Sequence, residues 1–120
     1  MPKTIPCTPW VNASVSDGCK WEYEVTFTEK RGGNATIERI GRRYVDTKGK
    51  VWTSGDGEWF DYTIDVPAKG SATYDSWVRT YPSGDPPDLR GATLKVSYSG
   101  TDESGRKFSG SVAAKLARSP

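Results

Sequence analysis

The stretch GATLKVSYSGTDESGRKFSGSVAAKL, residues 91–116, decides the fold class of this chain. Apolar and polar residues alternate on both sides of a central segment rich in Gly, Asp and Ser. The apolar positions are Ala92, Leu94, Val96 and Tyr98, then Phe108, Gly110, Val112, Ala114 and Leu116. Alternation with a period of two places one set of side chains against a core and the other in water. The stretch therefore predicts an antiparallel β-hairpin.

Further segments with strand character lie upstream of this hairpin. The clearest is KWEYEVTFTE, residues 20–29, in which Trp21, Tyr23, Val25 and Phe27 share one face. Other candidates are residues 10–15, 35–46, 51–53, 59–66 and 72–81, the last of which also suits a helical turn. Seven or eight short strands with turn signals about every ten residues predict an all-β protein, an antiparallel β-sandwich, with a closed barrel as the alternative.

The segment ATIERIGRRYVD, residues 35–46, breaks its own alternation. Ala35 and Ile37 share one parity, whereas Ile40 and Tyr44 share the other. One extra residue close to residues 39–41 would place all four on the same face. A Gly within a strand often marks such an insertion, so we expect a β-bulge there.

The length of 120 residues suits one domain. We expect an extended arm with three prolines at residues 1–9, the sandwich at residues 10–116 and a tail at residues 117–120. No signal peptide is recognisable after Met1, so the chain either stays in the cell or is a mature or excised piece. A formal charge of +2 and the lack of an apolar run of about 20 residues predict no nucleic-acid partner and no membrane insertion.

Cys7 and Cys19 are the two cysteines of the chain. Their spacing does not fit a CxxC redox motif, and the chain has no His to complete a metal site. We predict a disulfide that ties the N-terminal arm to the first long strand and indicates an oxidising compartment. The alternative is a pair of small, buried, reduced residues.

Three segments together resemble bacterial immunoglobulin-like domains of secreted or surface proteins. They are CKWEYEVTFTEKRGG, NATIERIGRRYVDTKGKV and DLRGATLKVSYSGTDESGRKFSGSVAAKL, which lie between Cys19 and Leu116. Their D-x-x-G turn and the final hairpin carry the resemblance. It implies an immunoglobulin-like β-sandwich that acts as an extracellular or cell-surface interaction module. Both cysteines precede or begin the first long strand, so the Cys…Trp…Cys spacing of antibody domains is missing.

Few residues suit catalysis. Without His there is no Ser/His/Asp or Cys/His arrangement, and the commonest general base is missing. Carboxylates cluster at Asp56, Glu58 and Asp61, and such pairs can hydrolyse glycosides, but solvated loop acids are the simpler interpretation. We therefore expect no enzyme activity and no cofactor. The segments SGDGEWFD and SGTDESG leave calcium as an alternative, although neither has EF-hand spacing.

Aromatic residues outside the clean inward-facing sets form the more specific candidate site. They are Trp52, Trp59, Trp77, Tyr74 and Tyr81. Exposed together on one face, they would stack on sugar rings or anchor a protein partner. The alternative is that they cover the ends of the core.

Several cations gather in the middle of the chain, among them Arg39, Arg42 and Arg43. With interleaved aromatic residues they would suit single-stranded nucleic acid. Because the chain is nearly neutral, we expect cross-strand ion pairs instead, with Glu22, Glu24 and Glu38 as available partners.

The sequence thus predicts a non-enzymatic extracellular interaction or accessory module that binds a protein or glycan. Binding is expected at the end loops, residues 54–58 and 83–89, and at the exposed aromatic residues. One alternative is a carbohydrate-binding module. Another is a structural subunit of a virion, filament or surface layer that self-associates through a sheet edge.

Overall fold

The computed structural model describes residues 1–10, 18–53, 57–79 and 88–120. These residues contain nine β-strands and no helix, so the prediction of an all-β protein is confirmed. Among the described residues there is accordingly no helix with the length and hydropathy needed to cross a membrane. The expected strand at residues 10–15 lies outside this part of the chain except for Trp10.

The larger of two sheets has six strands. Its order is β1 (Thr4–Ile5), β9 (Lys107–Leu116), β8 (Thr93–Asp102) and β4 (Ala35–Val45), with β5 (Val51–Trp52) and β6 (Trp59–Val66) both paired to β4. The β1–β9 pair is parallel and the others are antiparallel. The terminal hairpin from which the fold was predicted thus forms β8 and β9 of this sheet.

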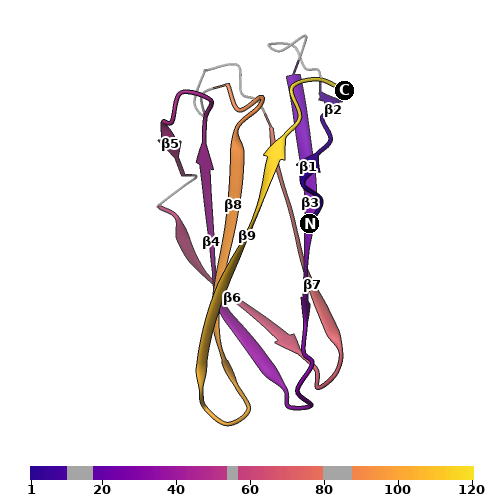
Figure 1. Ribbon diagram of the computed structural model, residues 1–120, viewed down its shortest axis with the longest axis vertical. Helices are drawn as coiled ribbons and strands as arrows, with labels where there is room; N and C mark the ends of the chain where they lie inside the picture. The colour runs from indigo at the N-terminus through magenta and orange to yellow at the C-terminus, as the bar shows by residue number, and fades with distance from the viewer. Residues whose placement is uncertain (11–17, 54–56, 80–87) are drawn as a thin grey trace.

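The smaller sheet has three strands in the order β2 (Thr8–Trp10), β3 (Gly18–Thr28) and β7 (Ser71–Arg79). Both pairs are antiparallel, and β3 and β7 stay in register from Lys20↔Arg79 to Thr28↔Ser71. The segment at residues 72–81, which also suited a helical turn, is therefore a strand as far as Arg79. The long strands of both sheets run along the long axis of the molecule, whose extents are 50 × 25 × 24 Å (Figure 1).

One core lies between the two sheets. The inward residues of β3 are buried as predicted, and Leu94, Val96, Ala114 and Leu116 of the terminal hairpin join them. Trp21 is the largest fully buried side chain of the described residues. Both sheets bury their inward side chains in this one cluster. Residues that bind a partner must therefore lie on the outer faces of the sheets or in the loops.

The expected bulge occurs in β4, slightly before the predicted place. The register of β4 shifts between Ile37 and Arg39: β4 has one residue more than β8 there, and one residue fewer than β6. Ile37, Ile40 and Tyr44 are consequently all buried, although Ile37 has the opposite parity to the other two. The inserted residue lets one strand keep its apolar side chains on the core face.

The N-terminal segment takes part in both sheets. It is extended, as the sequence predicts, but it supplies β1 to the larger sheet and β2 to the smaller one. Ile5 is fully buried, and its carbonyl accepts a hydrogen bond from the N–H of Ala117 in the expected tail. The chain termini are thus held against the same core.

Candidate functional site

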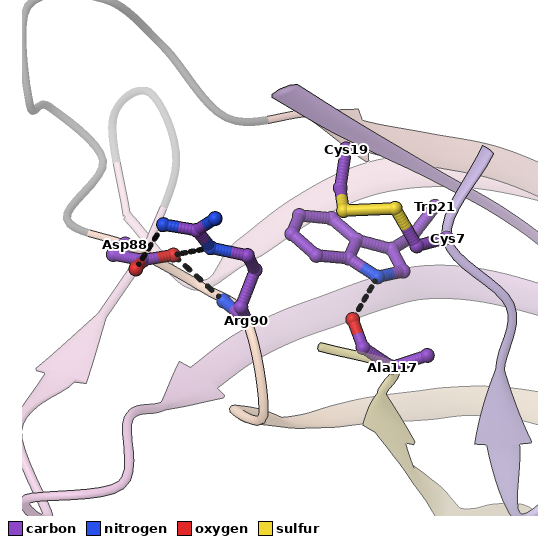
Figure 2. The surroundings of a disulfide bond; sticks show 6 residues. All are labelled: Cys7, Cys19, Trp21, Asp88, Arg90 and Ala117. Carbon is purple, nitrogen blue, oxygen red and sulfur yellow. Dashed lines mark hydrogen bonds and ion pairs between the residues drawn. A yellow bond between two sulfur atoms is a disulfide. The ribbon is translucent and has the colours of Figure 1, made fainter. Parts of the chain in front are cut away.

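A disulfide joins Cys7 and Cys19, as predicted (Figure 2). Cys7 directly precedes β2, Cys19 lies in β3, and both are buried in the core. The Cα atoms are 5.2 Å apart, within the usual range for such a bond. The bond therefore holds the N-terminal segment against β3.

The surroundings of the disulfide serve structure rather than chemistry. Trp21 lies beside it, and its indole N–H donates to the carbonyl of Ala117 at 3.0 Å (Figure 2). Nearby, Arg90 forms two side-chain hydrogen bonds to Asp88, at 2.9 and 2.8 Å. The hydrogen bond from Arg90 lowers the pKa of the Asp88 carboxyl below its ordinary value. With both sulfurs oxidised, no thiol is free.

The five aromatic candidates do not form one platform. Tyr74 is only 4% exposed and packs against Tyr62 and Phe60, so it belongs to the core. Trp52 is half-buried against Tyr44, with 5.2 Å between ring centroids. Tyr81 lies outside the described residues. Trp59 and Trp77 remain exposed, and they stand on the outer faces of different sheets.

Trp59 lies on the outer face of the six-stranded sheet. Gly41 is its cross-strand partner, and a Cβ at Gly41 would come within 3.0–3.2 Å of three indole atoms. The indole of Trp59 therefore packs directly on the backbone of Gly41, in the space that a side chain at position 41 would occupy. The Arg39 guanidinium sits 5.5 Å from the ring centroid, and the Trp59 side chain stays 39% exposed.

The arginines near Trp59 are paired with acids, although not with those expected. Arg39 pairs with Asp61 and Arg43 with Glu58, both at 3.6 Å, instead of with Glu22, Glu24 or Glu38. Arg42 points between the sheets, where it donates to Ser76 Oγ at 3.0 Å and stacks over Phe60. The strand β6, whose pairing with β4 the sequence did not reveal, brings Asp61 and Glu58 to these arginines.

Trp77 lies on the outer face of the three-stranded sheet and is 47% exposed. Lys20 and Arg79 approach its ring at 4.8 and 5.7 Å from the centroid. Its cross-strand partner is Glu22, which pairs with Lys20 at 3.5 Å. Contacts with two cations restrict the rotamers of this exposed indole.

Carboxylates gather next to Trp77. Glu24 stands directly opposite Asp75 in the β3–β7 register, and both are exposed. Together with Glu22 and Trp77 they border a shallow depression of about 500 Å³, whose lining also includes Tyr23 and Ser76. Like charges directly opposite each other destabilise a strand pair. Among the described residues neither Glu24 nor Asp75 forms an ion pair.

We call this set the Trp77 face. It consists of Trp77, Lys20, Glu22, Glu24, Asp75 and Arg79. The sequence shows Glu22 and Glu24 on the outward side of β3, but not that Asp75 and Trp77 would lie opposite them. That arrangement depends on the pairing of two strands about fifty positions apart, which no local pattern encodes.

The carboxylates considered for calcium or catalysis have other partners where they are described. Asp56 lies outside the described residues, and Glu58 and Asp61 pair with arginines. Asp102 accepts hydrogen bonds from Ser104 and from the N–H of Arg106 within its own turn. In the described ranges no group of three or more His, Cys, Asp or Glu residues is placed to hold a metal ion.

No family model matches the chain, and no curated protein matches it either. A solved structure, titled "X-ray structure of Northeast Structural Genomics Consortium target SoR45", is similar with a TM-score of 0.69. The match has 18% sequence identity and covers 93% of this chain and 81% of that one. At this identity the likeness concerns the fold alone.

Proposed function

We propose that this chain is a non-enzymatic, extracellular interaction module with an immunoglobulin-like sandwich, and that it binds a protein partner through the Trp77 face. The observation that carries the proposal is the exposed indole of Trp77 beside the opposed carboxylates Glu24 and Asp75, which form no ion pair with any other described residue. Trp is among the residue types that dominate binding energy at protein interfaces.

The charge of the Trp77 face indicates the chemistry of the partner. Glu24 and Asp75 repel each other in the free protein, and a cation placed between them would remove that repulsion. A Lys or Arg side chain of a partner can supply this cation while its apolar part packs against Trp77. We therefore propose a partner segment that presents a basic residue next to an apolar one.

The strand order supports the immunoglobulin-like part of the proposal. The strands β2, β3 and β7 take the places of A, B and E, and β9, β8 and β4 those of G, F and C. Two features differ from constant-type antibody domains: β6 pairs with β4, and the disulfide joins the segment before β2 to β3 instead of bridging the two sheets. The disulfide supports the extracellular location, because such bonds persist in oxidising compartments.

A selection from a random peptide library tests this function. Peptides that bind the wild-type protein should be enriched in Lys or Arg beside an apolar residue, and Trp77→Ala should weaken them at least tenfold. The matched control is Trp59→Ala, which removes a similarly exposed indole from the opposite outer face. The double variant Glu24→Gln, Asp75→Asn should abolish the preference for basic residues. Binders that tolerate Trp77→Ala as well as Trp59→Ala would refute the proposal.

Glycan binding is the second candidate, and the position of Trp59 favours it. Its indole lies on Gly41, and the same cross-strand row continues with Ser97 and Ser111, whose hydroxyl groups could bond to a sugar. A glycan array and retention on insoluble polysaccharides test this candidate. Retention lost in Trp59→Ala supports it, and no retention on any glycan excludes it.

A further inference from the structure

The edge of β9 is open along most of its length. Lys115 donates its N–H to the carbonyl of Lys3, whereas Leu116 donates to Ala92 on the opposite side. The alternation of a strand then directs the N–H groups of Lys107, Ser109, Ser111 and Ala113 to the outer edge. Within the described ranges, β1 covers only Lys115 and Leu116, and no other strand pairs with this edge.

A groove runs below this open edge, between β9 and the neighbouring β3 of the smaller sheet. It measures about 420 Å³, and apolar side chains from both sheets line it, including Val25, Phe27, Tyr98, Phe108 and Val112. Phe108 and Val112 belong to the inward-facing set of β9, yet Val112 is 36% exposed. Inward-facing apolar residues are therefore partly uncovered at the part of the edge to which no described strand pairs.

The open edge has few of the features that normally prevent edge-to-edge association. Proteins protect such edges with short strands, charged side chains, prolines, bulges or inward-pointing charges, and of these the open edge has only the charge of Lys107 at its start. The residues 107–113 contain no Pro, their pairing with β8 shows no register shift, and the inward residues are apolar or Gly. By contrast, β5 is only two residues long, and β6 carries Asp61 and Asp65.

We propose that a second copy of this chain covers the open edge, with the two β9 strands antiparallel about a two-fold axis at Gly110. Gly110 is the midpoint of residues 107–113. In this register Phe108 lies opposite the partner's Val112, Ser109 opposite the partner's Ser111, and Lys107 opposite the partner's Ala113. Apolar residues meet apolar ones and no like charges face each other, which favours pairing.

The neighbouring symmetric registers fit less well. An axis at Ser111 would place Lys107 opposite the partner's Lys115, where β1 already occupies the edge. An axis at Ser109 would place Phe108 opposite the partner's Gly110 and lose the apolar pair. The dimer would extend the six-stranded sheet and continue the strand addition that β1 begins on the same edge. It uses a different surface from the Trp77 face and does not depend on that proposal.

Sedimentation equilibrium tests the dimer between about 10 μM and about 1 mM, because an interface of one strand pair is small. The wild-type protein should dimerise in this range. Val112→Lys places a charge in the seam, and Ser111→Pro removes an N–H from the outer edge without touching the pairing to β8. Each should weaken the dimer at least tenfold. The control Val51→Lys adds the same charge at an exposed Val of β5 and should leave the dimer within twofold of the wild type.

Cysteine cross-linking tests the register. The Cα atoms of directly opposed residues would be about 5.5 Å apart, a separation that a disulfide can span. A mixture of Ser109→Cys and Ser111→Cys proteins should therefore cross-link to each other faster than either does to itself. A monomer at every concentration, a dimer unaffected by both Val112→Lys and Ser111→Pro, or cross-links only between identical variants would overturn the proposal.

Discussion

At the scale of single residues, one aspartate organises each of two turns with the same D-x-x-G-x pattern. Asp46 accepts the N–H groups of Lys48 and Lys50 through Oδ1, at 2.9 and 2.8 Å. Asp102 accepts those of Ser104 and Arg106 in the same way, at 3.0 and 2.9 Å. These bonds satisfy backbone donors that a tight turn leaves unpaired, so both acids act as structural residues.

A glycine completes each of the two turns. Gly49 and Gly105 both have φ of 85°, a left-handed conformation that favours Gly, and each donates its N–H to the carbonyl of the turn's Asp at 3.0 Å. The sequence predicted these turns correctly because their chemistry is local. The sequence also allowed calcium binding at SGTDESG, because Asp and Gly occur both in tight turns and in calcium-binding loops. The role of Asp102 in its turn is seen only from its hydrogen bonds.

Asp102→Asn should reduce the dependence of stability on acid pH. The hydroxyl of Ser104, together with the backbone N–H groups, lowers the pKa of Asp102 below its ordinary value of 3.8. The carboxylate therefore contributes stability above that value, and the contribution is lost as pH falls through the lower pKa of the folded state. The amide keeps an oxygen acceptor but does not titrate.

Urea midpoints measured from about pH 6 to about pH 2 check this prediction, because the window begins above the ordinary pKa of the carboxyl and extends below it. The midpoint of Asp102→Asn should fall less steeply with acid than that of the wild type. Equal slopes for wild type and Asp102→Asn would contradict the role assigned to the Asp102 carboxylate.

At the scale of elements, the bulge in β4 decides which side chains face the core. Before it, Ile37 is buried, and after it Ile40 and Tyr44 are buried with the opposite parity. The intervening Glu38 points outward and accepts a hydrogen bond from the Thr101 hydroxyl at 2.7 Å. Glu38 is the residue of β4 that has no counterpart in β8.

Deleting Glu38 should remove the bulge without turning the later side chains away from the core. Ile37 and Ile40 would then stand two positions apart, so Ile37, Ile40 and Tyr44 would share one face by regular alternation. We therefore expect the deletion variant to keep a cooperative unfolding transition. Glu38→Ala keeps the bulge and removes one exposed hydrogen bond, which should cost about 1 kcal/mol or less. Thermal unfolding followed by circular dichroism compares the two variants. Loss of cooperative unfolding in the deletion variant alone would show that the fold requires the bulge itself.

The same strand shows where sequence patterns stop being informative. The parity change predicted a bulge, because Ile37 and Ile40 are both apolar. It did not predict that Arg42 would point inward, where its guanidinium reaches Ser76 of the other sheet. A local sequence pattern predicts that a charged residue such as Arg42 is exposed to solvent. The polar partner of Arg42, Ser76, is recognised only when the two sheets are placed against each other.

At the scale of the whole molecule, the N-terminal segment links the two sheets. It pairs with β9 through β1 and with β3 through β2, and Cys7 bonds it covalently to Cys19. The three prolines of residues 1–9 predict an extended N-terminal arm. Its place in the core depends on the partners of Ile5 and on the disulfide, neither of which is encoded within the segment.

Replacing both cysteines by Ser should lower the free energy of unfolding by about 3 kcal/mol, because the disulfide closes a loop of about a dozen residues in the unfolded chain. The fold should remain, since Trp21 and Ile5 still have their buried contacts. Urea unfolding of the wild type with and without reductant should give the same difference as the Cys7→Ser, Cys19→Ser variant. An unchanged midpoint would mean that the bond adds nothing to stability.

The fold class, most strands and the disulfide could be predicted from the sequence because alternation, turn chemistry and cysteine count are local properties. The candidate site could be predicted only in part. Trp59 and Trp77 are exposed, whereas Tyr74 is buried. The sequence did not show that Tyr74 faces the core, because residues 72–81 suited a helical turn as well as a strand. The carboxylates of the Trp77 face emerge only from the register of β3 against β7.

The binding role of the Trp77 face is best tested by the affinity of one selected basic peptide for three proteins, measured by isothermal titration calorimetry. We predict that Trp77→Ala binds at least tenfold more weakly than the wild type, as expected for an anchor residue. We predict that Trp59→Ala, on the other outer face, binds within twofold of the wild type. Equal affinities for the wild type and Trp77→Ala would contradict the claim that the Trp77 face is the binding site.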